Sequence, residues 1–363
     1  MSATDARPEA SPYRVGLVGS GHISRTYMSA MRQVPEGRVV GVWSRQRAHA
    51  ESFAERARLE LATDCVEELC EAVDVVCVNS PNALHAEHAI AAARAGCHVI
   101  VEKPLAASHA QALRLLAACR EADVGLAYAE ELAFVPKFVR AREILQSGAL
   151  GDPLYVVQRE AHAGPYSPWF FTREEAGGGC LMDMGCHAVE CVRWLLGKPA
   201  LASVTAQIAT LQHRVGTPVD DHAVVQLEFA GGVRASCESS WVLQGGMQSR
   251  LEIWGSEGVL DVDLLRSTGL RLHLGQGSES LRAPAGWSAP LVDAMTDNGY
   301  PQELSHFLQC FREGRVPEES GEDGLRVMEI LCAAYLSARD GRTIAMPCEI
   351  PPHERAFDLF RTP

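Results

Sequence analysis

The stretch that decides the fold runs from Cys97 to Leu105 and has the sequence Cys-His-Val-Ile-Val-Glu-Lys-Pro-Leu. Its β-branched run predicts a buried strand, and the proline after the charged pair ends the strand pairing. Before this stretch the chain alternates short strands and helices, and the alternation stops within about 40 residues after it. Because open α/β sheets bind ligands at the carboxyl ends of their strands, we expect Glu102 and Lys103 at a ligand site. The alternative is an exposed Glu-Lys pair followed by a turn proline.

Composition limits the classes of protein to which the chain can belong. Its 363 residues suffice for two domains that each bury a core, and 47% apolar with 22% charged residues is ordinary for a globular protein. The formal charge of −13 argues against nucleic acid or an anionic membrane as the main partner. The sequence has no run near the ~20 apolar residues that cross a bilayer. We therefore expect neither a nucleic-acid nor a membrane partner.

The N-terminal sequence and the cysteines bear on the cellular compartment of the protein. Residues 1–12 contain no apolar segment, which favours a flexible polar leader over a signal peptide. The 12 cysteines are scattered and form no Cys-x-x-Cys pair. Reduced, mostly buried thiols in the cytoplasm are the expected result.

A glycine turn follows the first predicted strand, Tyr13 to Val18. Its sequence is Gly19-Ser20-Gly21-His22-Ile23-Ser24, and helical spacing then continues to Val34. Strand, glycine turn and helix in this order are the context that a dinucleotide fingerprint requires. Gly19 would allow the tight turn, and Gly21 would let a pyrophosphate approach the helix N-terminus, where His22 and Ile23 are further cofactor-contact candidates. Ser24 replaces the third glycine and is small enough for close helix–strand packing.

The second predicted strand, Arg38 to Ser44, bears on cofactor preference. An NAD site usually carries an acid at this strand end, but the sequence here is Ser44-Arg45-Gln46-Arg47. A hydroxyl and guanidinium groups suit a 2′-phosphate, so we expect NAD(P) with NADP(H) slightly favoured over NAD(H). The alternative is that both arginines face solvent at a helix start.

Further strands at Ala72–Asn79, Cys97–Val101 and Gly125–Tyr128 alternate with two helices. They complete a unit of about 115 residues, the size of one doubly wound domain. We therefore predict a Rossmann domain over residues 13–128, and a second α/β domain for substrate binding and oligomerisation over residues 129–363. In that second part the residues alternate from Leu201 onward as in a β-meander, and the open face of such a sheet predicts a homodimer or homotetramer interface.

Three segments in order carry a family resemblance: the glycine turn, the loop Ser80-Pro81-Asn82-Ala83-Leu84-His85, and Glu102-Lys103-Pro104. Together they resemble the glucose–fructose oxidoreductase / inositol dehydrogenase / rhizopine-catabolism (Gfo/Idh/MocA) family. The segment Gly177 to His187 is similar to that family's Asp-x-Gly-x-His segment, and Gly148 to Asp152 is similar to its domain junction. The resemblance implies a Rossmann domain followed by an α+β domain with a large, open, mainly antiparallel sheet.

The resemblance also implies an activity and a set of site residues. The implied activity is hydride transfer between a nicotinamide and a carbinol carbon of a sugar, cyclitol or related polyol. Lys103 would be the active-site lysine, Asp183 its substrate-side partner and His187 the acid/base, and all three would touch substrate. The implied cofactor contacts are Gly19, Gly21, Ser80, Pro81, Asn82, His85, Glu102 and Lys103. One departure is Glu130-Glu131, because many members have an asparagine after the glutamate, and this leaves substrate identity open.

These residue types suit the chemistry of alcohol oxidation. A neutral imidazole near pH 7 can take the hydroxyl proton, and an ammonium group can stabilise the developing alkoxide. Asp183 and His187 are four residues apart, so on a helix they would share one face, and Asp183 would orient both Lys103 and His187. We expect a lowered pKa for Lys103 between a cationic nicotinamide and a histidine.

Two features near this segment allow alternatives. Cys180, Cys186 and Cys191 make zinc conceivable, but their spacing is not that of a structural site, so we expect no metal. The aromatic loop from His162 to Phe171 mixes ring faces and polar groups as sugar pockets do, which makes His162, Tyr166 and Trp169 substrate candidates. A loop that merely packs against the glycine turn is the alternative.

Two other functions share the same residues. A glycoside-cleaving enzyme could keep its NAD tightly bound and work through a transient ketone. A nicotinamide-binding regulator without turnover is the other, although a sensor has no chemical need for Lys103, Asp183 and His187 together.

Overall fold

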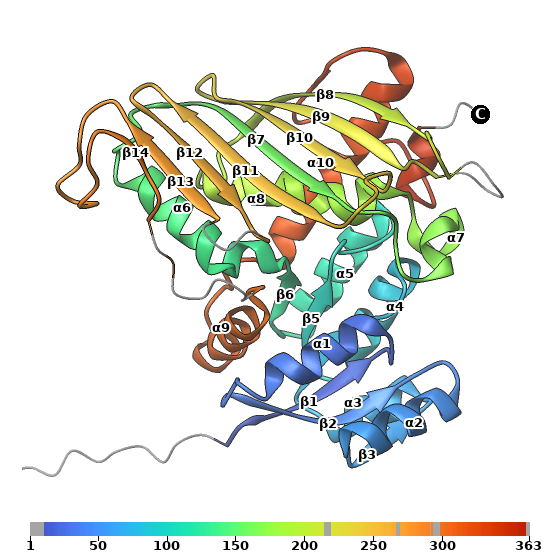
Figure 1. Cartoon of the computed structure of the whole chain (residues 1–363). Coiled ribbons are helices and arrows are strands. Elements are labelled where there is room, and N and C mark those ends of the chain that lie inside the picture. Colours follow the sequence, from blue (N-terminus) through green and yellow to red (C-terminus); the bar gives the residue numbers. More distant parts are fainter. Residues whose placement is uncertain (1–10, 214–218, 266–268, 291, 293–297, 361–363) are drawn as a thin grey trace, which may run out of the picture.

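The computed structural model describes residues 11–213, 219–265, 269–290, 292 and 298–360. Its first domain is built on a six-stranded parallel sheet in the order β3-β2-β1-β4-β5-β6, which is the doubly wound order (Figure 1). The strands are β1 (Tyr13–Val18), β2 (Gly37–Trp43), β3 (Leu61–Thr63), β4 (Val75–Val78), β5 (His98–Glu102) and β6 (Leu126–Ala129). The predicted Rossmann fold is confirmed.

Helices cover both faces of this sheet. They are α1 (His22–Met31), α2 (Arg47–Ala57), α3 (Val66–Ala72), α4 (Asn82–Arg94) and α5 (His109–Glu121). Side chains alternate along the strands, so that Val99 and Val101 pack into one core while Ile100, between them, packs into the other. Burial on both faces explains why the strands are continuous apolar runs. The fourth strand is shorter than predicted, because Ala72 ends α3 instead of starting the strand.

The second domain is built on a nine-stranded sheet in the order β14-β13-β12-β11-β7-β10-β9-β8-β15. The β7–β10 pair is parallel and the other pairs are antiparallel, so the mainly antiparallel sheet is also confirmed. Its strands are β7 (Pro153–Ala161), β8 (Leu201–Ala209), β9 (His222–Phe229), β10 (Arg234–Ser240), β11 (Gln248–Gly255), β12 (Gly258–Asp263), β13 (Leu270–Leu274), β14 (Gly286–Ser288) and β15 (Ile344–Ala345).

One face of the large sheet carries helices and the other is open (Figure 1). The covering helices are α6 (Pro136–Gln146), α8 (Cys186–Leu195) and α10 (Gly321–Asp340). The short helices are η1 (Glu131–Phe134), η2 (Pro168–Phe171), α7 (Arg173–Ala176), η3 (Leu181–Gly185) and η4 (Ala356–Leu359). Helix α9 (Tyr300–Glu313) returns to the first domain and packs beside α1.

The cysteines and helices bear on two other predictions. All 12 cysteines are unpaired, and ten are buried, Cys65 and Cys348 being the exceptions. Among the described residues, no helix has the length and apolar character needed to span a bilayer.

Candidate active site

The glycine turn shapes the start of α1 into a cradle. Gly19 has a φ of +125°, and a Cβ there would lie 2.6 Å from the carbonyl oxygen of Asn79, so only glycine fits. A Cβ at Gly21, by contrast, would meet no atom within 4 Å. Within the part of the chain that the structure describes, no side chain caps α1, which leaves its first N–H groups facing this open space. These features fit a pyrophosphate at the helix N-terminus.

Ser24, which stands in place of a third glycine, fastens the turn to the sheet. Its Oγ donates to the carbonyl oxygen of Gly19 at 2.7 Å and accepts from Asn79 Nδ2 at 3.2 Å. The serine is therefore more than a small residue that allows close packing, because its two hydrogen bonds hold the turn against the end of β4.

Both arginines after β2 lie near acidic side chains, and Arg45 is the more exposed and the more distantly paired of the two. The Ser44 hydroxyl accepts from Ser20 at 3.1 Å. The Arg45 side chain is 74% exposed and lies 3.9 Å from Glu175 of α7. Arg47 is 3.1 Å from Glu51 and 3.5 Å from Asp64. A 2′-phosphate would therefore depend on Ser44 and Arg45.

The loop from Ser80 to His85 is braced from two sides. The buried His85 ring lies 2.7 Å from the Ser80 carbonyl and 2.8 Å from the Pro104 carbonyl, which ties this loop to the end of β5. Burial lowers the pKa of His85 to about 4, although both carbonyl contacts work in the opposite direction. Asn82, which follows Pro81 at the start of α4, donates to the Ala176 carbonyl at 2.8 Å. Asn82 and His85 thus position the loop through protein contacts.

Lys103, at the end of β5, meets Asp183 in the turn before α8. Its Nζ lies 2.9 Å from both the carbonyl oxygen and Oδ1 of Asp183. Trp241 Nε1 donates to Asp183 Oδ2 at 2.9 Å, and His162 Nε2 lies 3.5 Å from the same oxygen. Although burial opposes it, the Lys103 charge holds the pKa of Asp183 below its usual value. Asp183 is therefore a fixed carboxylate.

The expected lowering of the Lys103 pKa is wrong for this structure. Burial does work against the ammonium charge, but the attraction of Asp183 outweighs it and raises the pKa of Lys103 above its usual value. Lys103 is therefore charged, and its chemical role is to stabilise negative charge on a neighbouring oxygen.

His187 pairs with Glu130, and this corrects the expectation that Asp183 orients the imidazole. Nδ1 lies 2.8 Å from Oε1 and 3.0 Å from Oε2 of Glu130. Burial lowers the pKa of His187 to about 4, so the ring is neutral near pH 7. Burial raises the pKa of Glu130 to about 8. When Glu130 is ionised, its two oxygens accept the proton of Nδ1, and Nε2 is then free to accept. Asp183 lies in the π-helical turn η3, and His187 begins the next turn in α8.

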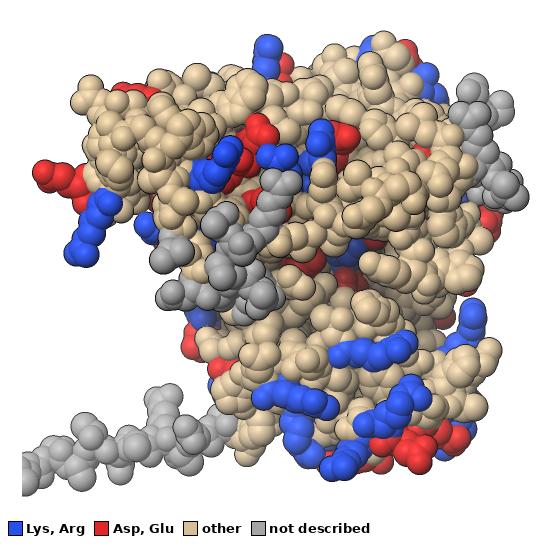
Figure 2. All heavy atoms as spheres, in the orientation of Figure 1, with Lys and Arg blue, Asp and Glu red and all other residues tan. Residues whose placement is uncertain are grey.

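Two further carboxyls surround this pair. Glu131 approaches His187 Nδ1 at 3.7 Å. Burial, and next the repulsion of Glu131, raise the pKa of Glu102 to about 8. Figure 2 shows a recess between the two domains with basic and acidic side chains on its floor.

The residues that could hold a metal ion differ from the three cysteines considered for zinc in the sequence. Ligand atoms of Glu130, Glu131 and His187 lie within 4.8 Å of one another, and within the described ranges this is the one such group. The three cysteines considered for zinc do not converge; Cys180 donates to Asp220 and Cys186 to the Asp183 carbonyl. Because Nδ1 already donates to Glu130, a cation there would have to displace that proton, and the absence of a metal stays a prediction.

The three substrate-contact candidates of the aromatic loop lie in different places. His162 reaches the site through Asp183, and its Nδ1 accepts from the Gly164 N–H at 3.0 Å. Tyr166 is 83% exposed, and its ring centroid lies 5.6 Å from that of His22 across the domain boundary. Trp169 stacks on Phe170 at 3.7 Å, as the packed-loop alternative expected.

Two residues of the site escaped prediction from the sequence. Trp241 has the alternation of a strand and looks like a core residue, and nothing local indicates that its N–H reaches Asp183. Glu130 was noticed as half of an unusual Glu-Glu pair, but its contact with His187 spans 57 positions.

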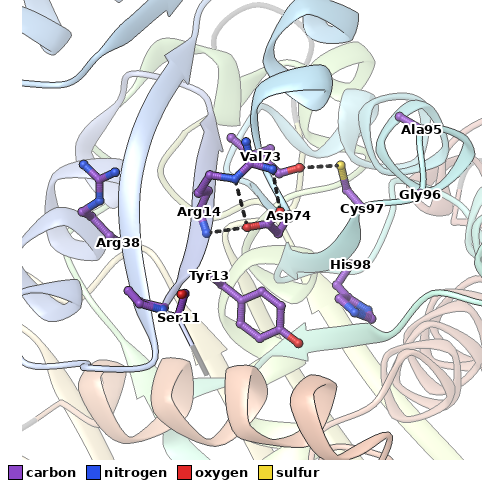
Figure 3. Close-up of a pocket in the computed structure, with 11 residues that line it drawn as sticks. Ser11, Tyr13, Arg14, Arg38, Val73, Asp74, Ala95, Gly96, Cys97 and His98 are labelled. Carbon is purple, nitrogen blue, oxygen red and sulfur yellow. Dashed lines mark hydrogen bonds and ion pairs between the residues drawn. The ribbon is translucent and has the colours of Figure 1, made fainter. Parts of the chain in front are cut away.

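One cavity lies away from these residues. It has a volume of about 660 Å³ and is lined by the amino ends of β1, β4 and β5, opposite the strand ends that carry Lys103 (Figure 3). Arg14 pairs there with Asp74 at 2.7 Å. Because parallel sheets bind ligands at their carboxyl ends, we place the reaction in the recess between the domains.

Comparison with known proteins agrees with this geometry. Residues 13–129 match the oxidoreductase family with an NAD-binding Rossmann fold, and residues 138–261 match the GFO/IDH/MocA C-terminal domain. Myo-inositol 2-dehydrogenase of Thermotoga maritima is 26% identical over 92% of this chain and 98% of its own. D-apiose dehydrogenase of Paraburkholderia graminis is 28% identical over 95% of each chain.

A solved structure extends the likeness to three dimensions. GenD2 from gentamicin A biosynthesis, in complex with NAD, superposes with a TM-score of 0.82 at 32% identity, covering 96% of this chain and 100% of its own. Two domain matches and relatives aligned over nearly their whole length lead to one conclusion: the chain belongs to the Gfo/Idh/MocA family of oxidoreductases.

Proposed function

We propose that this enzyme transfers hydride between a nicotinamide cofactor and a secondary alcohol or ketone carbon of a sugar, cyclitol or related polyol. The observation that carries the proposal is the ion pair between Lys103, at the end of β5, and Asp183, four residues before His187. This pair joins the cofactor domain to the helix that bears the proposed base.

The residues present fit a dinucleotide. Gly21 leaves room at the uncapped N-terminus of α1, and Ser24 keeps the turn against the sheet. When bound, the nicotinamide supplies the hydride acceptor or donor. The expected preference for NADP(H) depends on Ser44 and Arg45, and it stays a prediction because Arg47 is engaged with Glu51 and Asp64.

His187 and Lys103 divide the handling of the substrate oxygen. In alcohol oxidation, Nε2 of the neutral imidazole takes the hydroxyl proton, and the Glu130 carboxylate stabilises the resulting imidazolium through Nδ1. Lys103 donates a hydrogen bond to the same oxygen as its charge develops, while Asp183 holds the ammonium in place. In the reverse direction, the imidazolium returns the proton.

The substrate class follows from the relatives and the loop. Relatives named for myo-inositol and D-apiose support a small, hydroxyl-rich molecule. We propose that His162, which lies beside Asp183, contacts the substrate, and that Tyr166, whose ring lies near His22, contacts it from the side of the cofactor domain.

The open face of the large sheet is the proposed homo-oligomer interface, in a dimer or tetramer. Tyr155 and Trp254 pair on neighbouring strands of that face, with ring centroids 5.2 Å apart, and Trp254 is exposed. Light scattering after gel filtration tests the proposal, because Trp254→Glu should dissociate the assembly. The unpaired cysteines support a reducing compartment, the cytoplasm.

The activity test is a titration followed by a screen. NADH and NADPH fluorescence identifies the cofactor, and the oxidised form is then incubated with polyols, aldoses and glycosides. We expect reduced cofactor to accumulate with at least one polyol or sugar. Glycoside cleavage without net reduction would replace the proposal with the glycosidase-type alternative, and cofactor binding without any turnover would replace it with the regulator.

A further inference from the structure

Asp220, just before β9, holds the turn that carries Asp183. Its Oδ1 accepts from the N–H of Gly179 at 2.9 Å, and its Oδ2 accepts from the N–H of Leu181 at 2.7 Å. Its backbone carbonyl accepts from the N–H of Cys180, which lies between them, at 2.8 Å. A Cβ on Gly179 would lie 1.8 Å from that carbonyl oxygen, so only glycine permits this approach. One residue from a distant part of the sequence therefore fixes three consecutive backbone donors of the turn.

The buried carboxyl of Asp220 is fully used as an acceptor. Tyr335 on α10 donates its hydroxyl to Oδ1 at 2.8 Å, and the Cys180 thiol donates to Oδ2 at 3.4 Å. Burial raises the pKa of Asp220, and all four hydrogen bonds to its carboxyl oxygens oppose that rise. Because each oxygen faces two donors, the site suits a carboxylate, which only accepts, better than an amide.

The next residue reaches Asp183 from another direction. The Asp221 carbonyl accepts from the backbone N–H of Trp241 at 2.8 Å, and the Trp241 indole donates to Asp183 Oδ2 at 2.9 Å. The Asp221 carboxylate is itself anchored, because it accepts from the backbone N–H groups of residues 211–213. Adjacent residues of the chain therefore hold the turn and the carboxylate of Asp183 separately.

We propose that Asp220 is a positioning residue for hydride transfer: it holds the turn before α8 so that Asp183 Oδ1 meets Lys103 Nζ. This inference rests on the proposed oxidoreductase function. The Asp183 N–H donates to the Gly179 carbonyl at 3.1 Å, so a shift of the turn carries Asp183 with it. Asp220 is completely buried and acts through Asp183 and Lys103 without touching substrate.

The kinetic test removes one acceptor and keeps the shape of the side chain. In Asp220→Asn the new NH2 group faces a backbone N–H whichever way the amide turns, so the turn should shift. Asp183 then moves away from Lys103, and the pKa of Lys103 should fall relative to wild type because Asp183 no longer raises it as strongly. At saturating cofactor and substrate we expect kcat to drop by about 10- to 100-fold. The alkaline limb of kcat should begin at lower pH than in wild type, while cofactor affinity changes little.

Ser337→Ala is the control for simple destabilisation. Ser337 lies on α10, and its hydroxyl accepts from the Ala206 N–H at 3.0 Å and donates to the Arg342 carbonyl at 2.7 Å. Its loss should lower the melting temperature and leave kcat and the alkaline limb as in wild type. An alkaline limb that stays in place in folded D220N, or a change that S337A reproduces, would overturn the positioning role.

A chemical measurement decides the matter even if wild type turns over no member of the panel, an outcome that counts against the proposed function alone. Competitive acylation with acetic anhydride, followed by mass spectrometry of the Lys103 peptide, gives the pH at which this partly exposed amine becomes reactive. We expect that pH to be lower in D220N than in wild type, with S337A equal to wild type. Equal profiles in D220N and wild type refute the proposal.

A milder variant keeps the test open if D220N does not fold. Tyr335→Phe removes only the hydroxyl that donates to Asp220 Oδ1 and keeps the aromatic ring in the core. The Lys103 acylation profile should move in the same direction as expected for D220N, by a smaller amount. A profile that does not move in folded Y335F, when D220N is not folded, counts against the proposal.

Discussion

Two pairs of charged or titratable groups meet in the recess, one across the two domains and one within the second domain, and the pairs differ in kind. Lys103 and Asp183 form an ion pair whose electrostatic attraction keeps both groups charged. His187 and Glu130 form a buried hydrogen bond in which burial keeps the imidazole neutral. The first pair can stabilise charge but does not exchange a proton near pH 7. The second can, so the division of labour between the two pairs follows from the charge state of each.

The largest effect should come from removing the proton acceptor. His187→Gln should lower kcat by about 10²- to 10⁴-fold, because the hydroxyl proton has no base, while cofactor affinity stays within a few-fold of wild type. Steady-state kinetics and fluorescence titration measure the two, with His273→Gln on the large sheet as control. Near-normal turnover would assign the base to another residue.

The next effect should come from the fixed charge. Lys103→Met should lower kcat by about 10²- to 10³-fold, as expected for loss of one donor to a developing oxyanion. The residual activity should keep its acid limb, moved to higher pH, because the Lys103 charge no longer lowers the pKa of His187. Disappearance of that limb in this variant would show that Lys103 itself transfers the proton.

Glu130→Gln should sharpen the contrast between the pairs. We expect kcat to fall by about 10- to 100-fold, because an amide stabilises the imidazolium less than a carboxylate does. In wild type the activity should fall as pH drops towards the His187 pKa of about 4, where the base becomes protonated. In E130Q this limb should move to still lower pH. A loss of activity with an unmoved acid limb would mean that Glu130 only supports the fold. The matched control is Glu87→Gln, at an exposed position on α4.

The smallest effect should come from the indole that supports Asp183. Trp241→Phe removes the 2.9 Å hydrogen bond to Oδ2 and leaves the ion pair with Lys103. A fall in kcat/KM of about 3- to 10-fold is expected from one lost hydrogen bond to a charged group, with Trp254→Phe on the open face unchanged. A loss as large as that of Lys103→Met would show that the indole, and not the lysine, determines where Asp183 lies.

Local pattern was enough for much of this molecule. The glycine turn, the strand ending in Glu102-Lys103 and the alternation of β9 and β10 each follow from neighbours a few residues apart. The partners of the site were not predictable in this way, because Glu130 meets His187 and Trp241 meets Asp183 across more than 50 positions. The predicted direction of the Lys103 pKa shift was wrong for the same reason. That direction depends on the 2.9 Å distance between Lys103 and Asp183, which no local pattern gives.

Helix α9 has a practical consequence for anyone dissecting this enzyme. Its Leu308 and Phe311 occupy the space that a Cβ on Gly37 or Gly125 would need. The nucleotide domain therefore requires glycine at two positions because of a helix that comes much later in the sequence. A truncated gene encoding residues 13–128 alone would expose the apolar surface that α9 shields. Domain-swap chimeras should therefore carry α9 with the domain it covers, through circular permutation or a grafted linker, and not follow the order of the reading frame.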